Sequence, residues 1–124
     1  MTREDMLRHA EQWIDTVNRR DLDGLVLNFT ADASFLSPLA VTLLGKPLVE
    51  GKAALASYRR DAFDRASTIE FRLDHVVCDT ECREMVVVFD RMINGEHNRA
   101  CEFMRFDERG RQIFGEAMNG AKLG

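Results

Sequence analysis

The chain has 124 residues, with 17 Lys and Arg against 21 Asp and Glu, so its formal net charge is −4. This acidic balance argues against nucleic acid as the main partner, because the phosphate backbone would be repelled. No apolar run is long enough to span a membrane, and the first residues contain no apolar signal segment. We therefore expect one domain over residues 1–124, in the cytoplasm, with its three cysteines reduced and no cofactor bound.

The first half of the chain predicts three helices and one short strand. Apolar residues recur at helical spacing from Met6 to Val17, and Asp21 is a suitable cap for a short second helix. Residues 33–37 predict a short strand that Pro38 stops. Residues 39–49 predict a loop or an edge strand, because glycine and proline interrupt them. A third helix is expected over residues 51–66.

The second half predicts an antiparallel meander. A period of two places Ile69, Phe71, Leu73, His75 and Val77 on one face of a strand. Residues 84–93 form the next strand, Asn94-Gly95 predicts a two-residue type I′ hairpin, and residues 98–106 return. A last strand is expected over residues 112–119. Helices followed by a meander indicate an α+β fold.

The hairpin fixes a register in which Val87 lies opposite Glu102. Glu102 then sits on a largely apolar face, so its pKa should rise because the ionised form loses hydration. Such a carboxyl can donate or accept a proton. Alternatively, Glu102 pairs with Arg91 or Arg83, or reaches solvent at the sheet edge. The alternation of the preceding strand puts Cys78 and His75 on opposite faces, and Cys101 lies on a third strand, so no metal site is expected.

The order of elements, together with four short motifs, resembles the nuclear transport factor 2-like superfamily, and within it the SnoaL-like polyketide cyclase and ketosteroid isomerase group. The motifs are Asp21-Leu22-Asp23-Gly24-Leu25, Phe29-Thr30-Ala31-Asp32-Ala33, Ser37-Pro38, and Gly51 opening a helix. This resemblance covers nearly the whole chain. It implies a cystatin-like cone, in which a strongly curved antiparallel sheet wraps around three N-terminal helices and leaves an apolar pocket at one end. It also implies a homodimer packed through the outer sheet face, which carries Val86, Val88, Cys101 and Phe103.

The resemblance retains one of three polar positions in kind. Ketosteroid isomerases place a general-base aspartate before the proline that ends the first strand, and here that residue is Ser37. Their donor tyrosine on the first helix corresponds to Trp13. Their third polar residue corresponds to Glu102, which precedes Phe103-Met104-Arg105-Phe106. The steroid-type mechanism of the family is therefore not expected.

The pocket has a different set of candidate residues. Glu102 and His75 form an acid–base pair if both point inward; otherwise His75 is an ordinary core or rim histidine. The candidate ligand-binding residues are Trp13, Ser37, Tyr58, Phe89, Met104 and Asn119, although Trp13 and Tyr58 could equally belong to the core. The neighbouring run Tyr58-Arg59-Arg60-Asp61 is interpreted as a solvated helix face.

Three functions remain open. The first is an enzyme that isomerises or cyclises an apolar carbonyl compound, without a cofactor. The second is a non-catalytic binding protein for an apolar small molecule. The third is a dimeric interaction module with a vestigial pocket.

Overall fold

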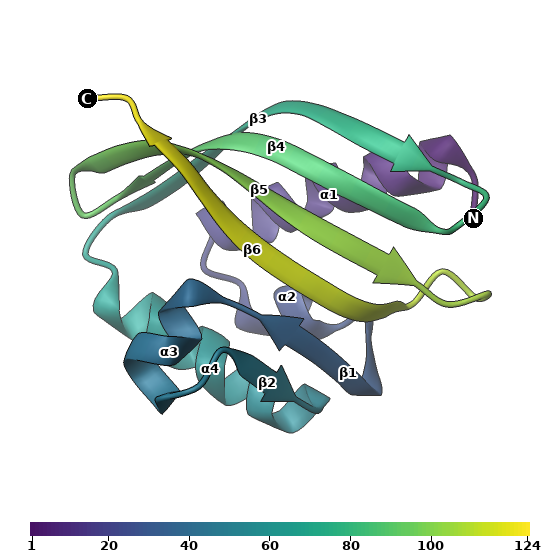
Figure 1. Ribbon diagram of the computed structural model, residues 1–124, viewed down its shortest axis with the longest axis horizontal. Coiled ribbons are helices and arrows are strands. Elements are labelled where there is room, and N and C mark those ends of the chain that lie inside the picture. The colour runs from purple at the N-terminus through teal and green to yellow at the C-terminus, as the bar shows by residue number, and fades with distance from the viewer.

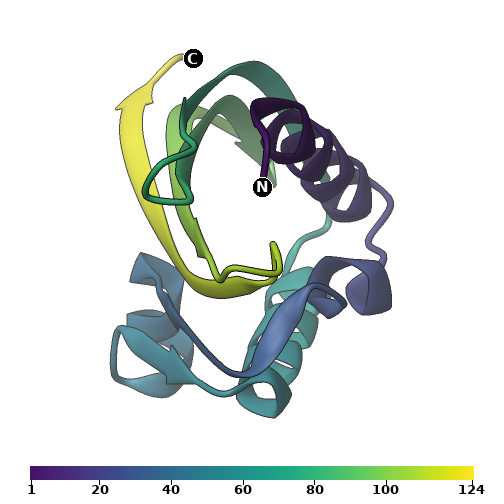
Figure 2. The ribbon, with the colours of Figure 1, turned by 90° about the vertical axis from the view of Figure 1, so that its right-hand side faces the viewer.

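The computed structural model describes residues 1–124 as a six-stranded curved sheet with four helices, the sheet order being β2-β1-β6-β5-β4-β3. The elements are α1 (Arg3–Asn18), α2 (Leu22–Val26), β1 (Phe29–Leu36), α3 (Pro38–Leu44), β2 (Leu48–Glu50), α4 (Lys52–Arg65), β3 (Ile69–Asp79), β4 (Glu84–Ile93), β5 (Glu96–Phe106) and β6 (Gln112–Lys122). The long strands β3 to β6 lie side by side in Figure 1, and Figure 2 shows them curling, with α1 across the open side of the curve. The α+β cone expected from the sequence is confirmed.

Helix α1 begins at a capping box, and its last residue makes two hydrogen bonds to the backbone of β3. The Thr2 hydroxyl accepts from the Asp5 backbone N–H at 3.1 Å, and the Asp5 carboxylate accepts from the Thr2 backbone N–H at 2.8 Å. At the last residue, the Asn18 side chain donates to the Phe71 carbonyl at 2.9 Å and accepts from the Phe71 N–H at 2.7 Å. Helix α1 is thus fixed against the edge strand β3.

The β4–β5 hairpin has the register expected from its Asn-Gly turn. Asn94 and Gly95 both have positive φ, at 52° and 82°, which a type I′ turn requires. Val87 lies opposite Glu102, and on the other face of the hairpin Val88 lies opposite Cys101. Glu102 therefore projects from the concave face, among the buried side chains of β4 and β5.

Strand β3 contains a bulge that the alternation of its sequence does not reveal. Leu73 pairs with Phe89, but His75 pairs with Val88, so the register shifts at Asp74. After the shift, Val76 packs against the core and Val77 is 56% exposed. The prediction that His75 and Val77 continue the inner face is therefore wrong, because one extra residue turns both of them outward.

The segment expected to be a loop or an edge strand contains helix α3 and strand β2. The Ser37 hydroxyl accepts from the Leu39 N–H at 3.2 Å and caps α3, while Pro38 occupies its first turn. Gly45 ends the helix with φ 77°. Helix α3 makes a fourth helix where three were expected, because Gly45 and Pro47 mark its end rather than interrupt a strand.

The parallel pairing of β1 with β6 depends on a small residue. Phe35 lies beside Gly115, where a Cβ atom would come within 2.8 Å of the Phe35 ring. The buried apolar residues form two clusters. One lies between α1 and strands β3 to β5, and the other lies among β1, β2, α3 and α4.

Candidate functional site

A cavity of about 540 Å³ opens between α4, the start of α3 and the concave side of β3 to β6, and its lining is mostly apolar. Five of the residues singled out from the sequence line it together, namely Ser37, Tyr58, Phe89, Glu102 and Asn119. They come from β5, β6, β4, α4 and the cap of α3, so only the curvature of the sheet brings them together. This volume is in the range of small-molecule sites.

Glu102 is the buried acid of this cavity. Only 3% of the residue is exposed, and its nearest cation is Arg59, whose Nη2 lies 3.5 Å from Oε2. Burial raises the pKa of Glu102 from 4.5 to about 7, although the Arg59 guanidinium acts in the opposite direction. The Glu102 carboxyl therefore populates both protonation states near neutral pH.

Glu102 has neither of the arginine partners considered from the sequence. The Arg91 guanidinium donates to the Asn98 side chain at 3.2 Å, and the Arg83 guanidinium donates to the Phe106 carbonyl at 3.4 Å. Glu102 does not reach solvent at the edge of the sheet either, because β5 is an interior strand between β4 and β6.

Arg59 is a cavity residue that was not among the candidate site residues from the sequence. Its side chain is only 13% exposed, and its guanidinium carbon lies 4.5 Å from the centroid of the Phe35 ring. The Nε and Nη2 atoms are buried and have no hydrogen-bond partner. Helical spacing did indicate that Arg59 faces inward, because it lies four residues after Leu55, on the same face as Tyr58. The prediction of a solvated face holds for Arg60 and Asp61, which are exposed, but is wrong for Tyr58 and Arg59.

Ser37 and Tyr58 form a buried hydroxyl pair on the cavity wall. The Ser37 Oγ and Tyr58 Oη atoms are 2.6 Å apart, and the two residues are 5% and 3% exposed. The Leu39 N–H already donates to Ser37. If the Ser37 hydroxyl donates to Tyr58, the phenolic proton is directed toward another acceptor, and a ligand oxygen could accept it.

His75 does not belong to the cavity. Its side chain is 58% exposed and lies 3.0 Å from the Asp74 carboxylate on the outer face of β3. Asp74 is also bound by Arg99 at 2.8 Å. The bulge in β3 turns the His75 side chain to the outer face. His75 and Glu102 therefore do not form an acid–base pair.

Trp13 and Met104 are core residues that lie outside this cavity. The Trp13 ring packs against Phe71 and Phe89, with centroids 5.7 Å and 5.2 Å apart. Met104 is completely buried in the same cluster. The Phe89 ring is shared, since it contacts Trp13 on one side and lines the cavity on the other. Asn119 is exposed, so it belongs to the rim of the cavity.

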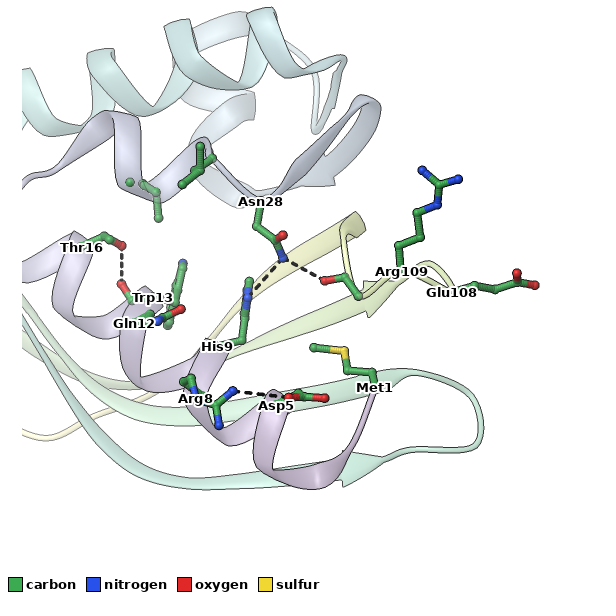
Figure 3. A pocket seen from close by; sticks show the side chains of 14 residues that line it. Met1, Asp5, Arg8, His9, Gln12, Trp13, Thr16, Asn28, Glu108 and Arg109 are labelled. Atoms are coloured by element: carbon green, nitrogen blue, oxygen red, sulfur yellow. Dashed lines mark hydrogen bonds and ion pairs between the residues drawn. The ribbon is translucent and has the colours of Figure 1, made fainter.

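A second hollow, of about 500 Å³, lies between α1, α2 and the turn that joins β5 to β6, and is shown in Figure 3. Several of its polar groups are paired with one another. Asn28 donates to the Gly110 carbonyl at 3.0 Å and lies 3.4 Å from the His9 ring, while Arg8 pairs with Asp5 at 3.4 Å. Burial lowers the pKa of His9, so a neutral imidazole is favoured there. The cavity around Glu102 is the better candidate, because the buried Nε and Nη2 atoms of Arg59 in it lack hydrogen-bond partners.

Two further features bear on the class of site. No helix has the length and apolar character needed to cross a membrane. No group of three or more His, Cys, Asp or Glu side chains is arranged to hold a metal ion.

Comparisons with known proteins place this geometry in a family. The profile of the SnoaL-like domain matches residues 10–114, while no curated protein matches the sequence. Among solved structures, a SnoaL-like protein of unknown function from Burkholderia thailandensis is 20% identical, with a TM-score of 0.85 over 98% of this chain and 99% of that one. A putative ketosteroid isomerase from Kribbella flavida is 12% identical, with a TM-score of 0.76 over 98% and 82%. The epoxide hydrolase/cyclase-like enzyme SalBIII, which is described as having a role in pyran ring formation in the polyether salinomycin, is 18% identical, with a TM-score of 0.74 over 97% of this chain and 95% of that one. The chain belongs to the SnoaL-like domain family.

Proposed function

We propose that this protein binds an apolar carbonyl compound in the cavity and catalyses its isomerisation or cyclisation, with Glu102 as the acid–base group. The observation that carries the proposal is the buried Glu102 carboxyl on the cavity wall, with a pKa of about 7. A group that titrates near the working pH is suited to both halves of a proton transfer. Ser37 occupies the position of the usual base in ketosteroid isomerases and is buried against Tyr58, so Glu102 replaces that base.

The chemistry begins with ionised Glu102. An Oε atom takes a proton from the carbon next to the ligand carbonyl, and the C–H electron pair becomes the carbon–carbon double bond of an enolate. The negative charge moves to the carbonyl oxygen, where the Tyr58 hydroxyl or an Arg59 N–H can stabilise it. If the ligand has a carbon–carbon double bond next to the deprotonated carbon, the enolate is a dienolate. Protonated Glu102 then returns the proton to the far end of that system, and the double bond moves into conjugation with the carbonyl, which isomerises the ligand. In a cyclisation, the enolate carbon instead attacks a second carbonyl of the same molecule, whose π electrons move to its oxygen. Protonated Glu102 gives its proton to this alkoxide and becomes ionised again.

Two of the neighbours in structure are described as enzymes or enzyme-like proteins. One is described as a putative ketosteroid isomerase and another as an epoxide hydrolase/cyclase-like enzyme. Both descriptions concern small-molecule chemistry on the same fold, and a fold hosts many activities. These neighbours show the fold alone. The argument for proton transfer therefore rests on the buried Glu102 carboxyl of this chain.

Proton exchange provides the test. 2-Tetralone is an apolar ketone small enough for the cavity, and its α-protons exchange with D₂O in a reaction that NMR follows. We expect the protein to accelerate this exchange and Glu102→Gln to lower the acceleration by about 100-fold or more. Glu11→Gln, which changes an exposed glutamate of α1, should keep the wild-type rate.

The alternatives give different results. A thermal shift with 2-tetralone but no accelerated exchange in the wild type would identify a non-catalytic binding protein. Neither a shift nor exchange, over a panel of related cyclic ketones, would identify an interaction module with a vestigial pocket.

A further inference from the structure

The cavity is cationic although the protein as a whole is acidic. Its charged lining side chains are three arginines and two glutamates, namely Arg59, Arg65, Arg91, Glu96 and Glu102. The whole chain carries a formal charge of −4. Protonation of Glu102 would increase the cationic excess in the cavity further. Low-dielectric walls strengthen the field of such groups, so the cavity favours a ligand with negative charge.

Arg59 is the cation among these whose buried nitrogens lack hydrogen-bond partners, whereas Arg65 is exposed to solvent. The Arg91 guanidinium already donates to the buried Asn98 side chain. The Nε and Nη2 atoms of Arg59 are buried without a hydrogen-bond partner. These two nitrogens lie on the same edge of the guanidinium plane, so their N–H bonds form a parallel fork that matches a carboxylate.

The Phe35 ring fixes the orientation of this fork. The Arg59 guanidinium carbon lies 4.5 Å from the Phe35 centroid and 5.7 Å from the Tyr58 centroid. Stacking of this kind restrains the guanidinium plane. The nearest counter-charge, the Glu102 carboxylate, is 3.5 Å away and makes no hydrogen bond with Arg59. Arg59 is thus oriented and charged, but incompletely bound.

We propose that the natural ligand is an apolar monocarboxylate whose carboxylate group binds the Nε and Nη2 atoms of Arg59. This inference rests on the proposed function, because it concerns the ligand of the same cavity. The apolar lining accommodates the body of the ligand, and Arg59 selects its charged end. An incoming carboxylate competes with Glu102 as the counter-charge of Arg59, so the protonated fraction of Glu102 rises. The proton transfer of the proposed function starts from the fraction that stays ionised.

This exchange of counter-charges makes binding depend on pH. Besides the charged side chains above, the titratable residues that line the cavity are Tyr58 and Cys101, and the Cys101 side chain projects from the opposite face of β5 to Glu102. Burial and the nearby Glu102 raise the pKa of Cys101, so this thiol stays neutral. Above pH of about 7, where free Glu102 is ionised, carboxylate affinity should fall by up to about tenfold for each pH unit. A neutral ligand of the same shape should lack this dependence.

Calorimetry with a matched pair of probes tests the inference. The probes are 4-phenylbutyrate and its neutral amide, 4-phenylbutanamide. We expect the wild type to bind the carboxylate at least about tenfold more tightly than the amide near pH 7. Arg59→Met should abolish the preference, whereas Arg60→Met, which changes the exposed neighbour on the same helix, should retain it.

A second variant guards against a folding defect. If Arg59→Met unfolds because Glu102 loses its counter-charge, the double variant Arg59→Met/Glu102→Gln removes both charges and should fold without charge preference. Equal affinity for the two probes in the wild type, a preference that survives loss of Arg59, or no binding of either probe overturns the inference. A carboxylate preference without accelerated exchange of 2-tetralone would reject the proposed catalysis and leave the anion site standing.

Discussion

Glu102 should make the stability of the protein decrease as the pH rises through the neutral range. Its pKa is 4.5 in an ordinary setting and about 7 in the folded protein, so the folded chain holds a proton that the unfolded chain releases. A raised pKa of this kind contributes stability that is fully present below pH 4.5 and is lost as the pH rises through about 7. At about 1.4 kcal/mol for each pKa unit, the loss amounts to about 3 kcal/mol.

Urea unfolding of the wild type and of Glu102→Gln measures this effect. The free energy of unfolding should fall by about 3 kcal/mol more in the wild type than in the variant, between about pH 4 and about pH 8. Other carboxylates titrate in both proteins. Arg99 lowers the pKa values of Asp74 and Asp90 by hydrogen bonding, and their contributions cancel when the two profiles are subtracted.

The control is the exposed residue Glu11 on α1. Glu11→Gln should keep the pH profile of the wild type, because this substitution removes a carboxylate without changing the cavity. Parallel profiles for the wild type and Glu102→Gln would refute the reasoning, since they would mean that Glu102 is as well hydrated in the folded protein as in the unfolded chain.

Three further substitutions test the architecture. Gly115→Ala should lower stability by about 1–3 kcal/mol in urea unfolding, because the new methyl group would meet the Phe35 ring at 2.8 Å. Asn18→Ala should remove both hydrogen bonds to the β3 backbone and speed amide exchange along that edge strand. The outer sheet face exposes Val77, and we expect it to pair with a second copy of the chain. Light scattering should then show a dimer that Val88→Asp converts to a monomer, whereas a monomeric wild type would contradict this expectation.

Local chemistry explains why the β4–β5 register could be predicted and the β3 register could not. The Asn94-Gly95 pair demands positive φ at both positions, so the turn alone fixes which residues face each other. Strand β3 contains no such marker. Its bulge at Asp74 follows from pairing with β4. The alternation of apolar and polar residues in the sequence gives no sign of this bulge. Glu102 was therefore placed correctly, and His75 was not.

The site residues divide in the same way. Ser37 and Tyr58 lie 21 positions apart in the chain, and no pattern in the sequence predicts that their hydroxyls meet at 2.6 Å. The ion pair of Arg59 with Glu102 also joins distant elements, α4 and β5. Helical spacing could have placed Arg59 on the inner face of α4, but a charged residue there is usually excluded from a core. Its burial depends on the Phe35 ring and the cavity, which exist only after the sheet has curved.

The looseness of the Arg59–Glu102 pair accounts for the chemistry available to this cavity. A short, hydrogen-bonded pair would hold the carboxyl ionised at every physiological pH, so it could not donate a proton. A carboxyl buried without any cation would stay protonated, so it could not accept one. At 3.5 Å and without a hydrogen bond, Arg59 offsets only part of the effect of burial, and the pKa of Glu102 is about 7. The same imperfect contact leaves two Arg59 donors unbound, so the feature that lets Glu102 exchange protons also leaves Arg59 free to bind an acidic ligand.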